Sequence, residues 1–364
     1  MLVAMRSARP EMPPPPRRSF ASDNAAGAHP RVLEALAAAN TGHALAYGDD
    51  DWTRRCAAEF GELFDADVTV RLVFNGTGAN VVALAAALGA LPGPHHAVIC
   101  TSQAHIAVDE TGAPERVLGT KLLGLEAPDG KLTPAHLDAV RHLRGDQHHV
   151  QPGVVSITQA TELGTLYAIE EIGALCDAAH ADGMYVHLDG ARIANATAAL
   201  GADRAALRAF TVDAGVDVVS FGGTKNGLLG GEAVVFLEPS LAVGSAYLRK
   251  QVTQLPSKMR YLAAQFEAVL ADDLWIETAR HANAMAAELH DRLRHLDGLD
   301  PGPPPQVNSL FPTLPADVLD RLREWSFFWE WDPARHQARW MTAWDTTLED
   351  IERFVAGVTH ALQR

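Results

Sequence analysis

Two side chains that follow predicted strands are the residues of this chain best suited to do chemistry. Lys225 follows the apolar run DVVSFGG, and Asp189 ends the strand-like run MYVHLD one α/β unit earlier. A lysine amine can form an imine with an aldehyde, and a carboxylate can hold a heteroaromatic ring nitrogen protonated. The pair therefore predicts an enzyme that uses pyridoxal 5'-phosphate (PLP). Taken singly, a lysine after a strand is more often solvated and Asp-Gly more often a turn.

The segment NGTGAN suits a phosphate group. A predicted strand precedes Gly76, Thr77 and Gly78, and an alanine-rich helix follows them. Unpaired backbone N–H groups and the positive end of the helix dipole would meet there, and Thr77 adds a hydroxyl donor. A tight strand-to-helix turn with no ligand is an equally good interpretation. The segment is neither GxGxxG nor a P-loop, which disfavours a dinucleotide or ATP.

Two more polar residues follow predicted strands. His105 comes after the run HHAVICT, and its imidazole can stack on a flat ring and exchange protons near neutral pH. Arg192, three residues after Asp189, offers a planar fork for a carboxylate or phenolate. The alternatives are a solvated loop histidine and a surface pair of Asp189 with Arg192. The nearby segment HADGMYVHLD matches no metal-ligand spacing, so no metal site is predicted.

The elements that must position these residues alternate between strand and helix patterns. Such alternation predicts an α/β fold with a mostly parallel central sheet between layers of helices. Its strand ends would bring the four candidate positions to one edge. Strands are expected at residues 68–74, 95–101, 153–160, 184–189 and 216–222, and helices at 31–40, 51–64, 81–91 and 169–183.

We expect three parts along the chain. Residues 1–19 contain a run of four prolines and are predicted to form a disordered tail. Residues 20–254 would form the large PLP-binding α/β domain, and residues 255–364 a small C-terminal α+β domain. The small domain contains strand-like pieces at SLFPTL, SFFWEW and ARWMTAW.

Composition limits the partners. The 364 residues carry a formal charge of −15, whereas nucleic acids and anionic membranes need a basic patch. No stretch reaches the roughly 18 continuous apolar residues of a membrane helix, and no secretory signal is evident. Cys56, Cys100 and Cys176 form no CxxC pair, which is typical of a reducing cytoplasm. We therefore expect a cytoplasmic protein that acts on a small molecule.

The motifs together carry a resemblance. In chain order the sequence contains FASDN, GHALAYGDDDWT, FNGTGAN, HIAVDETGAP, ITQATELGTLY, HLDGAR, FGGTKNG and ARWMTAWDT, which span nearly everything from Phe20 to the C-terminus. This combination resembles the low-specificity L-threonine aldolases, PLP-dependent enzymes of fold type I in the aspartate aminotransferase superfamily. The resemblance implies a PLP-dependent transferase-like fold.

The resemblance also implies roles for matching positions. Lys225 would carry the cofactor, Asp189 would hold the pyridine nitrogen, and His105 would stack on the ring. Gly76, Thr77 and Gly78 would bind the phosphate. Ser22, Arg192 and Arg339 would bind the substrate carboxylate, and Arg192 would also lie near the cofactor. Tyr47 and Glu110 would have supporting roles.

One departure from the family concerns the proton of the substrate hydroxyl. Many members have an ENTH segment whose histidine approaches that hydroxyl, whereas this chain has ITQATE, with Gln159 or Thr161 nearby. Glutamine cannot act as a base. His105, acting through a water, is therefore the expected proton acceptor.

The implied activity is reversible retro-aldol cleavage of L-threonine, L-allo-threonine and related 3-hydroxy-L-amino acids to glycine and an aldehyde. The same fold supports β-eliminating lyases and aminotransferases, and serine hydroxymethyltransferase is disfavoured because no added folate-binding region is evident. A noncatalytic PLP-binding or interaction protein is the remaining alternative. The family also implies a homodimer or homotetramer with its active site at the interface, where Lys250, Lys258 or Arg260 could reach a neighbour's phosphate.

Overall fold

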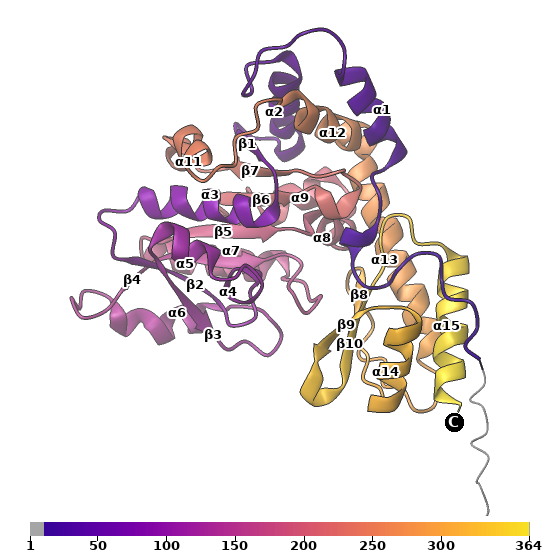
Figure 1. The fold of residues 1–364 in the computed structure, drawn as a ribbon. Coiled ribbons are helices and arrows are strands. Elements are labelled where there is room, and N and C mark those ends of the chain that lie inside the picture. Colours follow the sequence, from indigo (N-terminus) through magenta and orange to yellow (C-terminus); the bar gives the residue numbers. More distant parts are fainter. Residues whose placement is uncertain (1–10, 364) are drawn as a thin grey trace, which may run out of the picture.

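A computed structural model describes residues 11–363 and contains a seven-stranded sheet with helices on both faces (Figure 1). Its strand order is β1-β7-β6-β5-β4-β2-β3. Strands β2 to β6 pair in parallel, and β7 runs antiparallel to both of its neighbours. The predicted, mostly parallel sheet is confirmed. The strands are β1 (Thr69–Val73), β2 (His96–Thr101), β3 (Lys121–Leu125), β4 (Gln151–Thr158), β5 (Tyr185–Gly190), β6 (Val218–Gly222) and β7 (Glu232–Phe236).

Strands β3 and β7 were not predicted from the sequence. Strand β3 lies at the edge of the sheet and is half-buried, so it lacks the continuous apolar run of a central strand. Strand β7 is fully buried but begins at Glu232, a charged residue whose carboxylate accepts a hydrogen bond from Gly223 N at 2.6 Å. A charged residue at this position interrupts the apolar pattern from which a buried strand is predicted.

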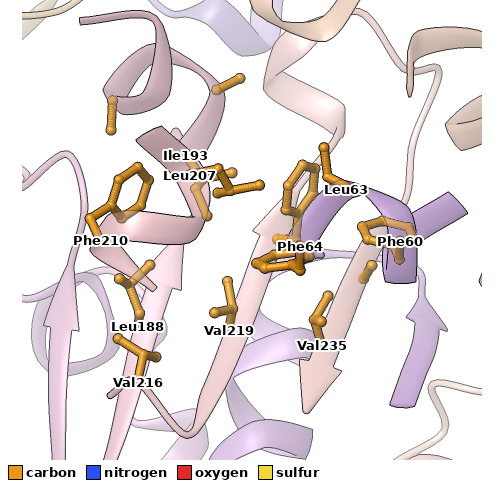
Figure 2. Close-up of a cluster of buried hydrophobic side chains, with 14 of the residues drawn as sticks. Phe60, Leu63, Phe64, Leu188, Ile193, Leu207, Phe210, Val216, Val219 and Val235 are labelled. Carbon is orange, nitrogen blue, oxygen red and sulfur yellow. The ribbon is translucent and has the colours of Figure 1, made fainter. Parts of the chain in front are cut away.

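Alternation along β5 determines which side chains face the site. Leu188 points to one face, where Figure 2 shows it in a buried cluster with Val219 and Val235 of the neighbouring strands and with Phe60 and Phe64 of α2 (Asp51–Phe64). Successive side chains of a strand point to opposite faces. The adjacent Asp189 therefore points to the other face, which α3 (Gly76–Gly89) covers.

The other helices of this part complete the two layers. Helix α12 (Arg260–Leu270) packs against α1 (Pro30–Ala39) and α2. The remaining helices are α4 (His105–Val108), α5 (Ala113–Leu118), α6 (Pro134–Val140), α7 (Ile169–Ala181), α8 (Ile193–Leu200), α9 (Arg204–Phe210), α10 (Pro239–Ala242) and α11 (Ser245–Gln251), with short 3₁₀ turns η1 (Asp23–Ala25), η2 (Arg141–Leu143), η3 (Thr224–Asn226) and η4 (Ala271–Asp273).

A smaller C-terminal unit packs beside the end of this sheet (Figure 1). It contains an antiparallel sheet in the order β8-β10-β9, built from β8 (Ser309–Leu310), β9 (Trp329–Asp332) and β10 (Gln337–Met341). The three predicted strand-like pieces are thus found. The helices of this unit are α13 (Leu274–Leu293), α14 (Ala316–Trp325) and α15 (Leu348–Leu362), with the 3₁₀ turn η5 (Pro333–Arg335). None of the helices within residues 11–363 is long and apolar enough to cross a membrane.

The change from one hydrophobic core to the other occurs inside α13. Trp275 and Ile276, in its first turn, belong to the core of the large sheet, whereas Leu289 and Leu293 belong to the core of the small unit. Helix α12 also packs with the large core. Helix α12 and the first turn of α13 thus pack with the part of the chain that precedes them, and the domain boundary at residue 254 stays a prediction.

The described part of the proposed N-terminal tail is packed against the small unit. Trp325 Nε1 donates a hydrogen bond to the carbonyl of Pro13 at 2.6 Å. The Arg18 guanidinium pairs with Asp350 at 3.0 Å and with Asp345 at 3.1 Å. For residues 11–19 the predicted disorder is therefore replaced by an extended segment that follows the C-terminal helices, and residues 1–10 lie outside the described residues.

Candidate active site

The polar residues predicted from the sequence meet at the carboxyl ends of β1, β2, β5 and β6. A narrow inner cavity of about 50 Å³ is lined by Gly76, His105, Asp189, Arg192 and Lys225, among others. A wider outer cavity of about 520 Å³ shares His105, Arg192 and Lys225 with it. The two cavities are therefore parts of one site, with a deep end at Asp189 and a mouth beside the small unit.

Asp189 lies at the deep end and is 4% exposed. Its Oδ2 accepts a hydrogen bond from Asn80 Nδ2 at 2.8 Å, and its Oδ1 accepts one from the backbone N–H of Ala191 at 3.0 Å. An ionised carboxylate has about four acceptor positions, so both oxygens keep capacity for a ligand N–H. The carboxylate is thus held in one orientation and aimed into the cavity.

A chain of hydrogen bonds links this carboxylate to His105. Glu110 Oε1 accepts one hydrogen bond from Asn80 Nδ2 at 2.8 Å and lies 2.9 Å from His105 Nδ1. The Glu110 hydrogen bond raises the pKa of His105, against burial, which lowers it, and the negative charge of Asp189 raises it further. Nδ1 of His105 is therefore committed to Glu110.

Lys225 occupies the short 3₁₀ turn η3 directly after β6. Burial lowers the pKa of its amine, and the positive charge of Arg192 lowers it further. A lysine needs its neutral form to attack a carbonyl. The site therefore favours the reactive state of Lys225.

The first turn of α3 contains the predicted phosphate-binding N–H groups. One of the three predicted donors, the N–H of Gly78, is already occupied. The N–H of Gly78 already donates to the capping side chain Asn75 at 2.8 Å, and the Gln254 side chain fills the space where a Cβ of Gly78 would lie. Gly76 and Thr77 precede it in the first turn, where N–H groups have no partner within the helix. A Cβ built on Gly76 would meet no other atom within 4 Å, which leaves room for an anion there.

Arg192 forms a buried ion pair that the sequence did not predict. Its Nε and Nη2 bind the two carboxylate oxygens of Asp23 at 2.7 and 2.9 Å. Asp23 is held in addition by Asn308 Nδ2 at 3.1 Å. Burial raises the pKa of Asp23, but the charge of Arg192 and its hydrogen bonds outweigh burial, so the pKa is lowered. The alternative pairing of Arg192 with Asp189 at the surface is wrong, since the partner is Asp23 and the pair is buried.

Arg339, by contrast, has bonding capacity left. It lies on β10 and lines the outer cavity with Ser22 and Trp331. Its Nε is buried and has no hydrogen-bond partner within residues 11–363, and its guanidinium lies 5.5 Å from the centroid of the Trp331 ring. Burial lowers its pKa, and so does the charge of Arg192. A carboxylate in the outer cavity would satisfy this side chain.

Gln159 and Thr161, named from the sequence as lying near the position of the ENTH histidine, do not reach the site. Gln159 exchanges two hydrogen bonds of 3.0 Å with the backbone of Tyr167, and Thr161 Oγ1 lies 2.6 Å from Thr165 Oγ1. Neither of them lines either cavity. Glu162, the next residue along, lines both. Tyr47 is half-exposed and lines neither cavity of the single chain.

Sequence reasoning missed Asn80, Glu162 and Asp23. Asn80 lies four residues after Gly76 on the same helix, so helical spacing alone places it on the face that carries Gly76. Glu162 follows the end of β4 just as His105 follows β2, which was the signal available for it. Asp23 carried no local signal, because its partner Arg192 is distant in the chain.

Residues 19–314 match the family described as beta-eliminating lyase. Low-specificity L-threonine aldolases from Pseudomonas aeruginosa and from a Pseudomonas species, strain NCIMB 10558, are 42% and 41% identical over 344 residues, which cover 94% of this chain and 97% of each relative. A solved threonine aldolase of Leishmania major superposes with a TM-score of 0.87 at 32% identity, covering 95% of this chain and 99% of that chain.

More distant structures share only the fold. A putative L-allo-threonine aldolase of Listeria monocytogenes superposes with a TM-score of 0.72 at 15% identity, covering 95% of this chain and 96% of that chain. The expected PLP-dependent transferase-like fold of type I is confirmed by these likenesses together with the sheet order. By its sequence and its architecture, the chain belongs to the beta-eliminating lyase family and, within it, to the low-specificity L-threonine aldolases.

Proposed function

We propose that this protein is a PLP-dependent carbon–carbon lyase that cleaves L-threonine, L-allo-threonine and related 3-hydroxy-L-amino acids to glycine and an aldehyde, and that also runs the aldol addition in reverse. The observation that carries the proposal is the buried arrangement of Lys225 and Asp189 in one cavity, next to the first turn of α3. The aldolase names of its relatives support this choice of reaction.

The residues present fit PLP. Asp189 is suited to the pyridine nitrogen, the first-turn N–H groups of Gly76 and Thr77 to the phosphate, and Lys225 to the aldehyde carbon. His105 is suited to stack on the ring. When bound, PLP supplies an electron sink for the bond that breaks at Cα.

The chain's own residues then select that bond. Arg339, with its unsatisfied buried Nε, binds the substrate carboxylate, and Ser22 lies beside it in the outer cavity. Holding the carboxylate fixes how the substrate is turned and hence which Cα bond is aligned for cleavage. Arg192 supports this arrangement through its bonds to Asp23. This role differs from the direct contact with the substrate carboxylate that the resemblance implied.

We also propose a homodimer or homotetramer, with the active site at the interface. Large apolar side chains are exposed on the single chain, with Leu45 at 72%, Val243 at 81% and Tyr247 at 77%. Contact between copies of the chain would remove such apolar surface from water. The test is the molar mass by light scattering during gel filtration, and a monomer at micromolar concentration would contradict the proposal.

A cytoplasmic location is part of the same proposal. Cys56, Cys100 and Cys176 are all free and buried, which is compatible with a reducing compartment.

The test of function compares wild type with Lys225→Ala. Wild type should show a visible absorbance band with PLP and should release aldehyde from L-threonine, L-allo-threonine or phenylserine, and the variant should lose both. Arg31→Ala, an exposed change on α1, is the control for general effects. A Lys225-dependent band without aldehyde from any of the three substrates would contradict the aldolase proposal.

The family description supports β-elimination as the second candidate. It is tested in the same assay by release of pyruvate and ammonia from L-serine. Transamination is tested by the appearance of a 2-oxo acid only when an amino acceptor is present.

A further inference from the structure

Glu162 is a carboxyl group at the junction of the two cavities for which no role has yet been assigned. It lines the inner cavity with Asp189 and Lys225, and the outer cavity with Arg339. Its side chain is held in place, because Oε1 accepts hydrogen bonds from the backbone N–H of His105 at 2.8 Å and from Thr158 Oγ1 at 2.9 Å. Both bonds go to Oε1, which leaves Oε2 as the oxygen able to face a substrate.

The other candidates for the hydroxyl proton are poorly placed. Gln159 and Thr161 are bonded to Tyr167 and Thr165, away from the cavities. His105 has Nδ1 committed to Glu110, and its ring is the group proposed to stack on the cofactor. We therefore prefer Glu162 to His105, which the sequence predicted as the base.

We propose that the Glu162 carboxylate accepts the proton of the substrate β-hydroxyl during cleavage. The inference rests on the proposed aldolase function. As the O–H bond breaks, its proton moves to Glu162 Oε2 and its electron pair becomes the second bond of the aldehyde carbonyl. The Cα–Cβ bond breaks at the same time, and its electron pair stays with the glycine half until Cα takes up a proton. Glu162 returns the proton to solvent through the outer cavity.

The surroundings of Glu162 suit this role. Burial raises its pKa above the ordinary value, and Asp189 raises it further, while the N–H of His105 and the Thr158 hydroxyl lower it. A base works best when its pKa lies close to the working pH. The charged and titratable groups facing it are Asp189 from β5, Arg192 from the start of α8, Cys100 from β2 and Tyr167 from the loop after β4.

The decisive variant is Glu162→Gln, compared with Glu162→Asp and with the exposed control Glu115→Gln. Two reactions are measured on each PLP-loaded protein. One is aldehyde release from L-threonine and phenylserine, and the other is exchange of the glycine α-proton for deuterium, followed by NMR in D₂O. Exchange needs Lys225, Asp189 and the carboxylate site but involves no β-hydroxyl.

We expect kcat for cleavage by Glu162→Gln to fall by about 100-fold or more, the range for loss of a general base, with glycine exchange within about threefold of wild type. Glu162→Asp should recover part of the loss. If cleavage and exchange fall together, Glu162 is structural and the proposal is overturned. Unchanged cleavage overturns it as well.

Failure of the proposed function has a different signature, since wild type would then exchange glycine but release no aldehyde from any 3-hydroxy amino acid. That result would overturn both inferences.

A measurement without cofactor provides a second criterion. When the pKa of a carboxyl group is higher in the folded protein than in the unfolded chain, the protein becomes less stable as the pH rises. The loss begins near the pKa of the unfolded chain and continues to the pKa of the folded protein. The unfolding midpoint of cofactor-free Glu162→Gln should therefore exceed that of wild type at pH 8, and the difference should shrink toward pH 4. A difference independent of pH would mean that Glu162 does not titrate in the site and would overturn the proposal.

Discussion

At the scale of single residues, a chain of hydrogen bonds connects two carboxylates that have different partners in the site. Asn80 Nδ2 bridges Glu110 and Asp189 at 2.8 Å each, so one amide orients both groups. Glu110 in turn binds Nδ1 of His105, and Asp189 faces the deep end of the cavity. Because the network lies in a region of low dielectric, a change at one member is felt at the others.

This network predicts that Glu110→Gln lowers the pKa of His105 toward its ordinary value. The largest cause of the raised pKa is the Glu110 hydrogen bond, and a neutral amide removes its charge. His105 would then contribute stability that is fully present below its unfolded pKa and lost at a lower pH than in wild type. The measurement is a pH titration of the His105 ring signals by NMR. A His105 pKa unchanged from the value in Glu115→Gln would contradict the assignment.

At the scale of elements, the packing of α2 against α12 brings two acidic groups together. Glu59 of α2 is partly buried with Oε2 unpaired, and burial followed by the charge of Glu267 on α12 raises its pKa to about 7. Glu267 itself is paired with Arg55 Nε at 3.0 Å. The interface therefore combines apolar packing, such as Phe60 against Phe266, with one ion pair and one carboxyl whose pKa is raised.

Glu59→Gln should stabilise the protein at pH 8 by about 1 kcal/mol, a value reduced for solvent screening. A carboxyl pKa raised on folding removes stability as pH rises from near 4 to near 7, and glutamine abolishes that loss. Urea unfolding at pH 5 and pH 8 measures the effect, with the exposed Glu34→Gln of α1 as the control. A gain equal at both pH values would argue against titration of Glu59.

At the scale of the whole molecule, the described N-terminal segment joins the small unit to the active site. Phe20 is 1% exposed and its ring lies 4.4 Å from that of Phe354 on α15. Its carbonyl accepts a hydrogen bond from Met341 N at 2.8 Å. Ser22 and Asp23 follow immediately, so the anchoring of Phe20 determines where these site residues lie. Figure 1 shows this segment running along the C-terminal helices before it reaches the larger sheet.

Phe20→Ala should therefore lower both stability and substrate binding. Loss of a buried phenylalanine costs about 3–5 kcal/mol. The shifted Ser22 and Asp23 should raise KM for the amino acid more than they lower kcat. Urea unfolding and steady-state kinetics at one temperature measure the two effects. As a matched control, Phe210→Ala removes a buried ring from the large core, away from this segment, and it should lower stability without raising KM.

Local sequence determined much of this protein. The positions of Lys225, Asp189 and His105 after apolar runs, and of Gly76 at a helix start, follow from patterns within a few residues, because a buried strand and the turn after it are encoded locally. The mostly parallel sheet followed from the alternation of strands and helices, since parallel strands need crossover connections.

Tertiary structure alone decided the partners of these residues. The pairing of Arg192 with Asp23, the bridge from Asn80 to Asp189, and the entry of Glu162 rather than Gln159 into the cavity each join segments distant in the chain. Helix α12 likewise packed with the large core because its apolar face matched α1 and α2. The spacing of charged and polar residues along the sequence does not indicate which distant residue each will bind, so only the packed fold determines which of them meet.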